Sequence, residues 1–282
     1  MTFDRTTQDV GNIIALEHVN LRVPDFHVAT TFYVHGLGCT RDPYIDLGPN
    51  LVWFNIGDQQ FHVPLAEAPD VLRGVINVVV PRLDDLEQRL ENVTPALGGT
   101  AFDYSRDGDL CRVTGPYGNQ FSCREADDTT HRTLALESVQ FLVPEGSAES
   151  IAAFYRSILG ARSTTEEGLC RVDAGPRQHL VFRETDAPLP DYDGHHIAIY
   201  VADFSSPYGR LVERELLFEE SNDAQYRFLW IVDPGSGEPV FEIEHEVRSM
   251  YHPLYRRALV NRNLRQASSG CVPGADPFSP VL

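Results

Sequence analysis

The segment His18-Val19-Asn20-Leu21-Arg22-Val23 sets the organisation of this chain, because similar segments recur at nearly equal intervals. Its apolar residues alternate with polar ones, which is the period of a β-strand buried on one face. The other three copies begin at residues 75, 138 and 196, so successive starts are 57, 63 and 58 residues apart. A repeat of about 60 residues is too long for most helical arrays and suits a supersecondary module. The chain is therefore expected to contain four copies of one module.

A helical stretch is expected to follow the first strand and to end in a shared signature in the first and third modules. It reads Phe32-Tyr33-x-x-x-Leu37-Gly38 in the first and Phe154-Tyr155-x-x-x-Leu159-Gly160 in the third. The aromatic pair is expected to pack in the core, and the glycine to end the helix in a left-handed conformation. Pro24-Asp25 and Pro144-Glu145 are the expected helix starts.

Three strand-like runs complete each module, so the expected order is β-α-β-β-β. In the first module they lie near residues 44–47, 51–56 and 60–65. This pattern predicts an α+β fold of four tandem modules, expected at residues 12–67, 72–126, 133–186 and 193–250. The modules are expected to form two domains, residues 12–126 and 133–250, joined by a polar linker around residues 127–132. Residues 251–282 are expected to be an extension that becomes rich in Ser, Gly and Pro.

The composition excludes several classes of function. The 23 basic residues are all arginine, so no lysine is available for a Schiff base or a nucleotide phosphate loop. A net charge of −18 opposes binding to nucleic acid or to an anionic membrane. The sequence has no apolar run of the roughly 18 residues that span a bilayer, and a signal peptide is not expected. The five cysteines have no metal-type spacing and are expected to be reduced thiols, so a cytoplasmic location is expected.

With four βαβββ units in two pairs, the chain resembles the vicinal oxygen chelate superfamily, which includes glyoxalases, bleomycin-resistance proteins and extradiol dioxygenases. Besides the Phe-Tyr-x-x-x-Leu-Gly signature, the resemblance rests on His-x-x-x-x-Val-Pro-Asp at residues 18–25 and Asp-Pro-x-x-Gly at residues 233–237. It covers about residues 12–250. It implies that two modules close a cupped mixed sheet, and that metal ligands come from the first and last strands of modules and point into the cup.

Strand parity selects the residues that would face the cup of modules three and four, because residues two apart on a strand share a face. It assigns His179, His196 and Glu242 as metal ligands. Two imidazoles and one carboxylate are typical of non-haem iron and catalytic zinc sites. The expected cofactor is a divalent metal, with Fe(II) favoured and zinc, manganese and nickel as alternatives. Tyr200 and Glu244, on the same faces as these ligands, are the candidate general acid and base.

Two points of this assignment stay open. Glu244 is a rival to Glu242, because both have inward parity. The extradiol dioxygenases that the chain resembles take a ligand from the first strand of module three, where this chain has Ser138.

The first module carries a second candidate pair of ligands. His18 and His62 occupy the matching inward positions, but the module-two positions expected to complete their site are Val75 and Ser122. Whether His18 and His62 bind a metal therefore stays open at this point.

The leading hypothesis is a mononuclear metalloenzyme of dioxygenase type, acting on a small organic substrate that chelates the metal through two adjacent oxygens. One alternative is a metal-free protein that binds a small molecule, as resistance proteins of the superfamily do. Another is a metal-dependent isomerase or epimerase. The expected partner is a small molecule, with no nucleic acid and no membrane, and a homodimer is a further expectation from the resemblance.

Overall fold

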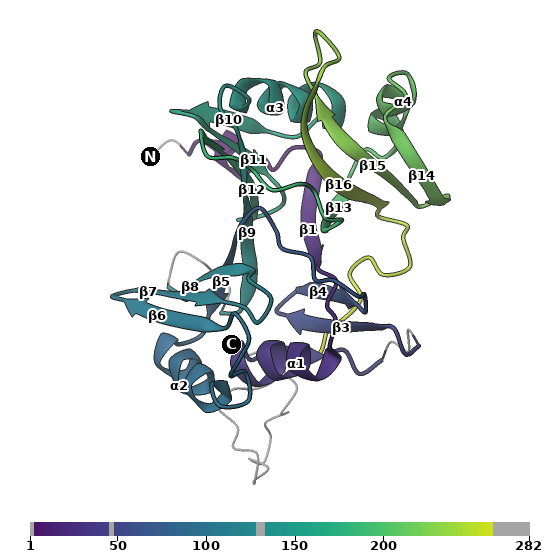
Figure 1. Ribbon diagram of the computed structural model, residues 1–282. Helices are drawn as coiled ribbons and strands as arrows, with labels where there is room; N and C mark the ends of the chain where they lie inside the picture. Colours follow the sequence, from purple (N-terminus) through teal and green to yellow (C-terminus); the bar gives the residue numbers. More distant parts are fainter. Residues whose placement is uncertain (1–2, 45–47, 128–132, 262–282) are drawn as a thin grey trace. The chain divides into compact units, whose positions relative to one another are not determined.

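The computed structural model describes residues 3–44, 48–127 and 133–261 (Figure 1). The 3-10 turn η1 (Arg5–Gln8) precedes the first module. That module contains β1 (Ile13–Asn20), α1 (Phe26–Thr30), the π-helical turn η2 (Thr31–Gly36), β2 (Thr40–Arg41), β3 (Leu51–Ile56) and β4 (Gln59–Pro64). The second contains β5 (Gly74–Val80), α2 (Leu83–Val93), β6 (Asp103–Asp107), β7 (Leu110–Thr114) and β8 (Gln120–Glu125).

The third and fourth modules repeat this order. The third contains β9 (Ala135–Pro144), α3 (Ala148–Phe154), the π-helical turn η3 (Tyr155–Leu159), β10 (Ser163–Glu166), β11 (Leu169–Asp173) and β12 (His179–Thr185). The fourth contains β13 (His196–Val201), α4 (Ser205–Val212), β14 (Leu217–Asn222), β15 (Gln225–Val232) and β16 (Pro239–Ser249). The predicted β-α-β-β-β order is thus confirmed in all four modules.

Both sheets are mixed. The first strand of a module pairs in parallel with its last strand, as in β1 with β4, β5 with β8 and β13 with β16. The other strands of a module form antiparallel hairpins, as in β3 with β4 and β7 with β8. The first and last strands of a module can pair in parallel because the helix and the two strands between them provide the long connection that a parallel pair needs. The predicted α+β class with mixed sheets is confirmed.

The strand order differs from the expected closure of neighbouring modules. One eight-stranded sheet has the order β14-β15-β16-β13-β1-β4-β3-β2, and the other has the order β10-β11-β12-β9-β5-β8-β7-β6. Strands of modules one and four therefore share one sheet, and strands of modules two and three share the other. The four first strands alternate in the same way, so their pattern specifies which face is buried but not which strand lies next to which.

The chain divides into two compact units. Unit 1 takes Met1–Leu16, Phe141–Tyr192 and His196–Tyr255. Unit 2 takes Glu17–Gln140, Asp193–His195 and Arg256–Leu282. Unit 1 therefore holds most of modules three and four, and unit 2 most of modules one and two. The two domain ranges expected from the sequence stay a prediction.

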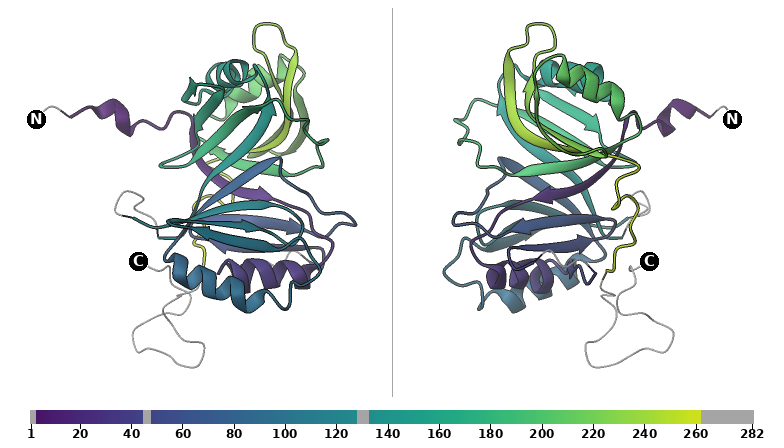
Figure 2. Two further views of the ribbon diagram at one scale, coloured as in Figure 1. Left: turned by 60° about the vertical axis from the view of Figure 1, so that its left-hand side comes forward. Right: turned by 90° about the vertical axis from the view of Figure 1, so that its right-hand side faces the viewer.

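The core of unit 2 lies between its helices and its strands. Figure 2 shows α1 and α2 along one face of the strands of this unit. Phe32 and Tyr33 lie on this side, where Tyr33 stacks on Phe54 at 5.0 Å and Phe32 contacts Phe121 at 5.3 Å between ring centroids. Asp25 is the N-cap of α1, as expected, and its carboxylate accepts hydrogen bonds from the backbone N–H groups of residues 27 and 28.

The core of unit 1 is built in the same way around the second copy of the signature. Tyr155 contacts Phe182 at 5.5 Å, and Phe154 contacts Phe228 at 5.7 Å between ring centroids. Gly160 has a φ of +68° and ends η3, so the predicted left-handed helix stop is confirmed there. The helix start is shifted, because Ser147 rather than Glu145 is the N-cap of α3.

Some expectations fall partly outside the described residues. The strand expected near residues 44–47 includes residues 45–47, which lie outside them, and the described strand of that region is β2. Residues 128–132 of the expected linker and residues 262–282 of the expected extension also lie outside. No helix in the described part of the chain is both long enough and apolar enough to cross a membrane.

Candidate functional site

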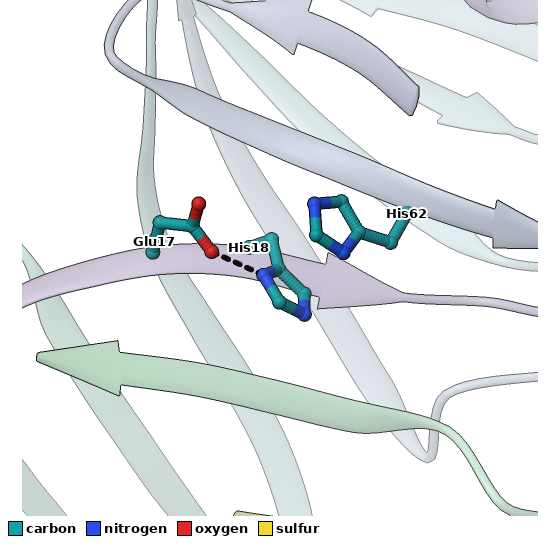
Figure 3. Close-up of side chains that lie close together, drawn as sticks. All are labelled: Glu17, His18 and His62. Carbon is teal, nitrogen blue, oxygen red and sulfur yellow. Dashed lines mark hydrogen bonds and ion pairs between the residues drawn. The ribbon is translucent and has the colours of Figure 1, made fainter. Parts of the chain in front are cut away.

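A buried group of metal-binding side chains, Glu17, His18 and His62, lies in unit 2 (Figure 3). Each residue offers one ligand atom, and these three atoms lie within 4.8 Å of one another. His18 is on β1 and His62 on the neighbouring parallel strand β4, where Asn20 is the residue opposite His62. His18 is 0% and His62 5% exposed, so the two imidazoles are shielded from bulk water. We call this group the Glu17–His18–His62 cluster.

Hydrogen bonds orient both imidazoles. The Glu17 carboxylate accepts a hydrogen bond from Nδ1 of His18, and Figure 3 shows this contact as a dashed line. Nε2 of His62 donates to Oε1 of Gln60 over 3.2 Å. A neutral imidazole that donates through one nitrogen carries its lone pair on the other. This pattern places the lone pairs on Nε2 of His18 and Nδ1 of His62.

Stacked rings hold His62 in place. Its imidazole stacks on the indole of Trp53 with centroids 3.8 Å apart and planes inclined by 2°, and on its other side it stacks on His18 at 3.5 Å. Trp53 lies opposite His62 on the adjacent strand β3. The ring of His62 is therefore held between two aromatic neighbours.

A polar network fixes Gln60, the hydrogen-bond partner of His62. Nε2 of Gln60 donates to Oδ1 of Asn55 at 2.6 Å and to Oδ2 of Asp42 at 3.2 Å. Arg257 forms an ion pair with the same Asp42 oxygen at 2.6 Å. Asp42, Asn55 and Gln60 are all buried, so these hydrogen bonds satisfy groups that would otherwise be costly to bury.

The donor set of the cluster suits a divalent transition metal. Two imidazole nitrogens and one carboxylate oxygen are the ligands of the two-histidine, one-carboxylate type of non-haem iron site, and they also bind zinc. A carboxylate that holds the second nitrogen of a ligating histidine also fixes its tautomer, as Glu17 does for His18. The side chains present therefore fit a metal, with Glu17 either as a ligand or as the group that orients His18.

A second group of ionisable side chains lies in unit 1 around His196. His196 on β13 is paired with Glu244 on the parallel strand β16, and Glu246 follows two residues later on the same face. Nδ1 of His196 is 3.4 Å from Oε1 of Glu244, and Nε2 is 3.8 Å from Oε2 of Glu246. We call this set the His196–Glu244–Glu246 group.

Two arginines neutralise the carboxylates of this group. Arg227 on β15 contacts Glu244 at 2.5 Å through Nη1 and contacts Glu246 through Nη2. Arg248 contacts the other oxygen of Glu246 at 2.5 Å. Burial raises the pKa of the Glu244 carboxyl above its ordinary value, although the Arg227 guanidinium lowers it. A carboxylate with a raised pKa is a better general base than that of an exposed glutamate.

Solved structures identify the fold, whereas no protein-family model and no curated protein matches this sequence. A putative dioxygenase from Bacillus subtilis subsp. subtilis str. 168 matches with a TM-score of 0.56 and 18% identity, over 84% of this chain and 86% of that chain. Glyoxalase I from Zea mays matches with a TM-score of 0.60 and 13% identity, over 83% and 92% of the two chains. The cppA protein from Streptococcus pneumoniae TIGR4 matches with a TM-score of 0.50 and 12% identity, over 86% and 100%.

The chain has the vicinal oxygen chelate fold. Members with this fold were expected to carry ligands on the first and last strands of a module. The Glu17–His18–His62 cluster occupies the first and last strands of module one, and the His196–Glu244–Glu246 group occupies those of module four.

The structure does not bring His179 together with the other predicted ligands. His179 is on β12, which belongs to one sheet, whereas His196 and Glu242 are on β13 and β16 of the other. The neighbours of His179 are instead Asp173, at 3.3 Å from its Nδ1, and Arg171, which contacts its Nε2. The prediction assumed that β12 and β13 line the same cup of the vicinal oxygen chelate fold. The structure places these two strands in different sheets.

The remaining predicted residues lie on the sheet that carries His196. Glu242 is opposite Trp230 of β15, while Glu244 is opposite His196, so the register places the rival carboxylate next to the histidine. Tyr200 lies on the same strand as His196 and is 2% exposed. Its hydroxyl is 3.5 Å from Nδ1 of His252.

Two carboxylates of these groups escaped the sequence reasoning. Glu17 directly precedes His18, so parity assigns it to the opposite face, yet its carboxylate reaches the His18 ring. Glu246 shares the parity of Glu242 and Glu244, and this shared parity was the signal that could have identified it.

Proposed function

We propose that this protein is a mononuclear divalent-metal enzyme with dioxygenase-like chemistry. Its substrate would be a small organic molecule that chelates the metal through two adjacent oxygens. The observation that supports this proposal most directly is the buried Glu17–His18–His62 cluster, whose three ligand atoms lie within 4.8 Å of one another. The fold that the chain shares with glyoxalase I from Zea mays and with a putative dioxygenase supports the enzyme class.

We infer that Fe(II) is the preferred metal, because two histidines and one carboxylate are the ligands of a common type of non-haem iron site. Zinc, manganese and nickel are alternatives, because nitrogen and oxygen donors suit all four. A bound ion would supply the charge that holds two substrate oxygens and stabilises negative charge developing on them. His18 and His62 would hold it. Glu17 would bind it or keep the proton of His18 on Nδ1, which leaves the lone pair of the neutral ring on Nε2.

The His196–Glu244–Glu246 group is the second candidate for a ligand set and for acid–base chemistry. The proposal keeps His196 as a ligand candidate and replaces Glu242 by Glu244 or Glu246, because these two carboxylates lie 3.4 and 3.8 Å from its nitrogens. The raised pKa of Glu244 supports a role in proton transfer. Tyr200, buried on the same strand, remains the candidate acid.

The metal content of single-residue variants tests this proposal. Protein purified without chelator, and protein reconstituted with Fe(II) under anaerobic conditions, would be analysed for metal per chain. We expect about one ion per wild-type chain and a loss of at least tenfold in affinity for His18→Ala and His62→Ala. His196→Ala, measured separately, decides by itself whether His196 is a ligand. His27→Ala, which removes an exposed histidine, is the control.

Oxygen consumption separates the enzyme classes. The reconstituted protein would be mixed with a panel of catechols and 2-oxo acids in an oxygen electrode. Uptake that needs both iron and substrate supports the dioxygenase, whereas substrate turnover without uptake supports an isomerase or epimerase. Metal content that is equally low in wild type and in all three histidine variants would overturn both.

A metal-free protein that binds a small molecule is the second candidate, and one observation favours it. Arg227 and Arg248 already neutralise Glu244 and Glu246, so these carboxylates need no metal ion for charge balance. Substrate-sized ligands that bind equally well with and without added metal would support this candidate.

A reducing, cytoplasmic location and a homodimer belong to the same proposal. Cys39, Cys111, Cys123 and Cys170 are free and buried. Burial raises the pKa of Cys39 and of Cys170 to about 12, so neither thiol is ionised at neutral pH. Sedimentation in solution tests the dimer.

A further inference from the structure

A pocket of about 250 Å³ opens in unit 1 between the start of α4 and the hairpin of β14 and β15, on residues that none of the roles above uses. The helix contributes Ser205 and Tyr208 to its wall, and the N-cap residue Phe204 contributes a third side chain. The hairpin contributes the remaining lining residues, which are Glu220, Asn222, Asp223, Gln225 and Tyr226.

Three aromatic rings form one side of this pocket. Tyr226 is in contact with Phe204, with ring centroids 4.8 Å apart and planes inclined by 38°. It is also in contact with Tyr208, at 5.5 Å and 59°. Tyr226 is buried between these contacts, whereas Phe204 and Tyr208 are partly exposed, so these two rings are the accessible part of the aromatic wall.

Hydrogen bonds hold two of these rings in place. The hydroxyl of Tyr226 donates to the backbone carbonyl of Phe204 over 3.3 Å, which joins the hairpin to the start of α4. The hydroxyl of Tyr208 donates to Oε1 of Glu220 over 2.8 Å. Glu220 and Tyr226 face each other in the hairpin register, so the carboxylate is held beside the rings.

The charge of the pocket is negative. Glu220 and Asp223 are both in its lining, and no arginine or histidine is. Among the described residues, neither carboxylate forms an ion pair with an arginine, in contrast to Glu244 and Glu246. An organic anion would be repelled here, whereas a cation would be attracted.

We propose that this pocket binds a small quaternary ammonium ion. Aromatic faces attract such a cation through the ring quadrupole, and carboxylates at the rim add Coulomb attraction. A cation of this kind has no N–H groups and is weakly hydrated, so it suits an aromatic wall better than a metal ion or a primary amine does. The quaternary ammonium group of a free small molecule and that of a lipid headgroup share this chemistry.

Calorimetric titration of the full chain with choline tests the proposal, and 3,3-dimethyl-1-butanol is the neutral probe of the same shape. We expect one choline site per chain and binding of the neutral probe that is weaker by about tenfold or more, because cation–π attraction is lost. Equal affinity for the two probes, or no saturable choline binding, would overturn the proposal. Vesicles of phosphatidylcholine form a second arm: co-sedimentation assigns the headgroup as the source, and choline binding alone assigns a free ion.

Variants of Tyr208 and Glu220 separate recognition from folding. We expect Tyr208→Leu to lower choline affinity about tenfold and Tyr208→Phe to stay within about threefold of wild type, because phenylalanine keeps the ring. Glu220→Gln should weaken choline binding and leave the neutral probe unaffected. Tyr251→Leu, at a residue 94% exposed and outside the pocket, is the control. Choline affinity that is unchanged in both Tyr208→Leu and Glu220→Gln would exclude this pocket as the site.

Discussion

The imidazoles of His18 and His62 stack with ring centroids 3.5 Å apart and planes inclined by 22°, although the two residues are 44 positions apart in the chain. Neighbouring parallel strands place them side by side, and each ring has a hydrogen-bond partner that orients it. Both rings are therefore held in place by their protein neighbours.

The carboxylate of Glu17 should control how well this pair binds a metal. Glu17→Gln keeps the size of the side chain but removes the negative charge beside Nδ1 of His18. We expect the dissociation constant for Fe(II) or Zn(II) to rise about 10–100-fold, as for other groups that orient a ligating histidine. Competition with a chromophoric chelator measures it. Glu145→Gln, at an exposed glutamate, should behave as wild type, and an unchanged constant in Glu17→Gln would remove Glu17 from the site.

The ion pair of Arg248 and Glu246 should matter for stability. Their side chains are only 6% and 3% exposed, so Arg248→Met leaves a buried carboxylate with one guanidinium fewer. We expect a loss of about 3 kcal/mol in the free energy of unfolding, measured in urea, because Glu246 stays buried and loses one of its two guanidinium partners. The exposed pair of Arg112 and Asp107 provides the control, and Arg112→Met should change stability by less than about 0.5 kcal/mol. Similar values for the two variants would contradict the buried-pair interpretation.

His245 should make stability depend on pH. It is fully buried, accepts a hydrogen bond from the Tyr155 hydroxyl at 2.6 Å, and donates from Nδ1 to the carbonyl of Ile243 at 2.9 Å. Burial lowers its pKa from 6.5 to about 4. Between these values the unfolded chain binds a proton that the folded chain does not, so stability falls as the pH drops through this range.

Comparison with His245→Gln isolates this effect from that of the carboxylates. Between pH 7.5 and 4.5 we expect wild type to lose about 2–3 kcal/mol more unfolding free energy than the variant, as a pKa shift of this size requires. Urea titrations at several pH values measure the difference. Parallel pH profiles for the two proteins would show that His245 is not the titrating group.

The left-handed residue after η3 should favour glycine. Gly160 has a φ of +68°, and an added Cβ would lie 3.3 Å from Cβ of Asn12. We expect Gly160→Ala to cost about 1–2 kcal/mol of unfolding free energy in urea, mainly from backbone strain. Gly98→Ala is the matched control, because its added Cβ meets only Pro95 O at the ordinary distance of 3.5 Å. Equal effects at both glycines would exclude strain as the cause.

Local features of the fold could be predicted from the sequence because local patterns encode them. The alternation from His18 to Val23 predicted a strand in this region, and the structure places β1 earlier, at Ile13–Asn20. The Phe-Tyr pairs identified the core faces of the helices. The choice of strand neighbours could not be predicted, because every first strand offers the same hydrogen-bonding edge. That choice also decided the candidate site. Parity correctly assigned His196 and Glu244 to one face, but it could not exclude His179, which lies on a strand of the other sheet.

Side-chain reach also limited the prediction. Successive Cβ atoms of a strand point to opposite faces, so the alternation rule places Glu17 and His18 on opposite faces of β1. A carboxylate on a two-carbon stem can nevertheless bend round to its neighbour, as Glu17 does. The histidines of the cluster were therefore recognised, while its carboxylate was not.

The π-helical turns η2 and η3 occur in alternate modules, and this pattern bears on how the modules were duplicated. In the described part of the chain, one π-helical turn follows α1 and another follows α3, and each overlaps the Phe-Tyr signature, whereas α2 and α4 are followed by none. An irregularity shared by alternate modules is what remains when an ancestral pair of modules, one with the π-helical turn and one without, is copied once as a whole. This alternation favours one doubling of a two-module pair over the serial addition of single modules.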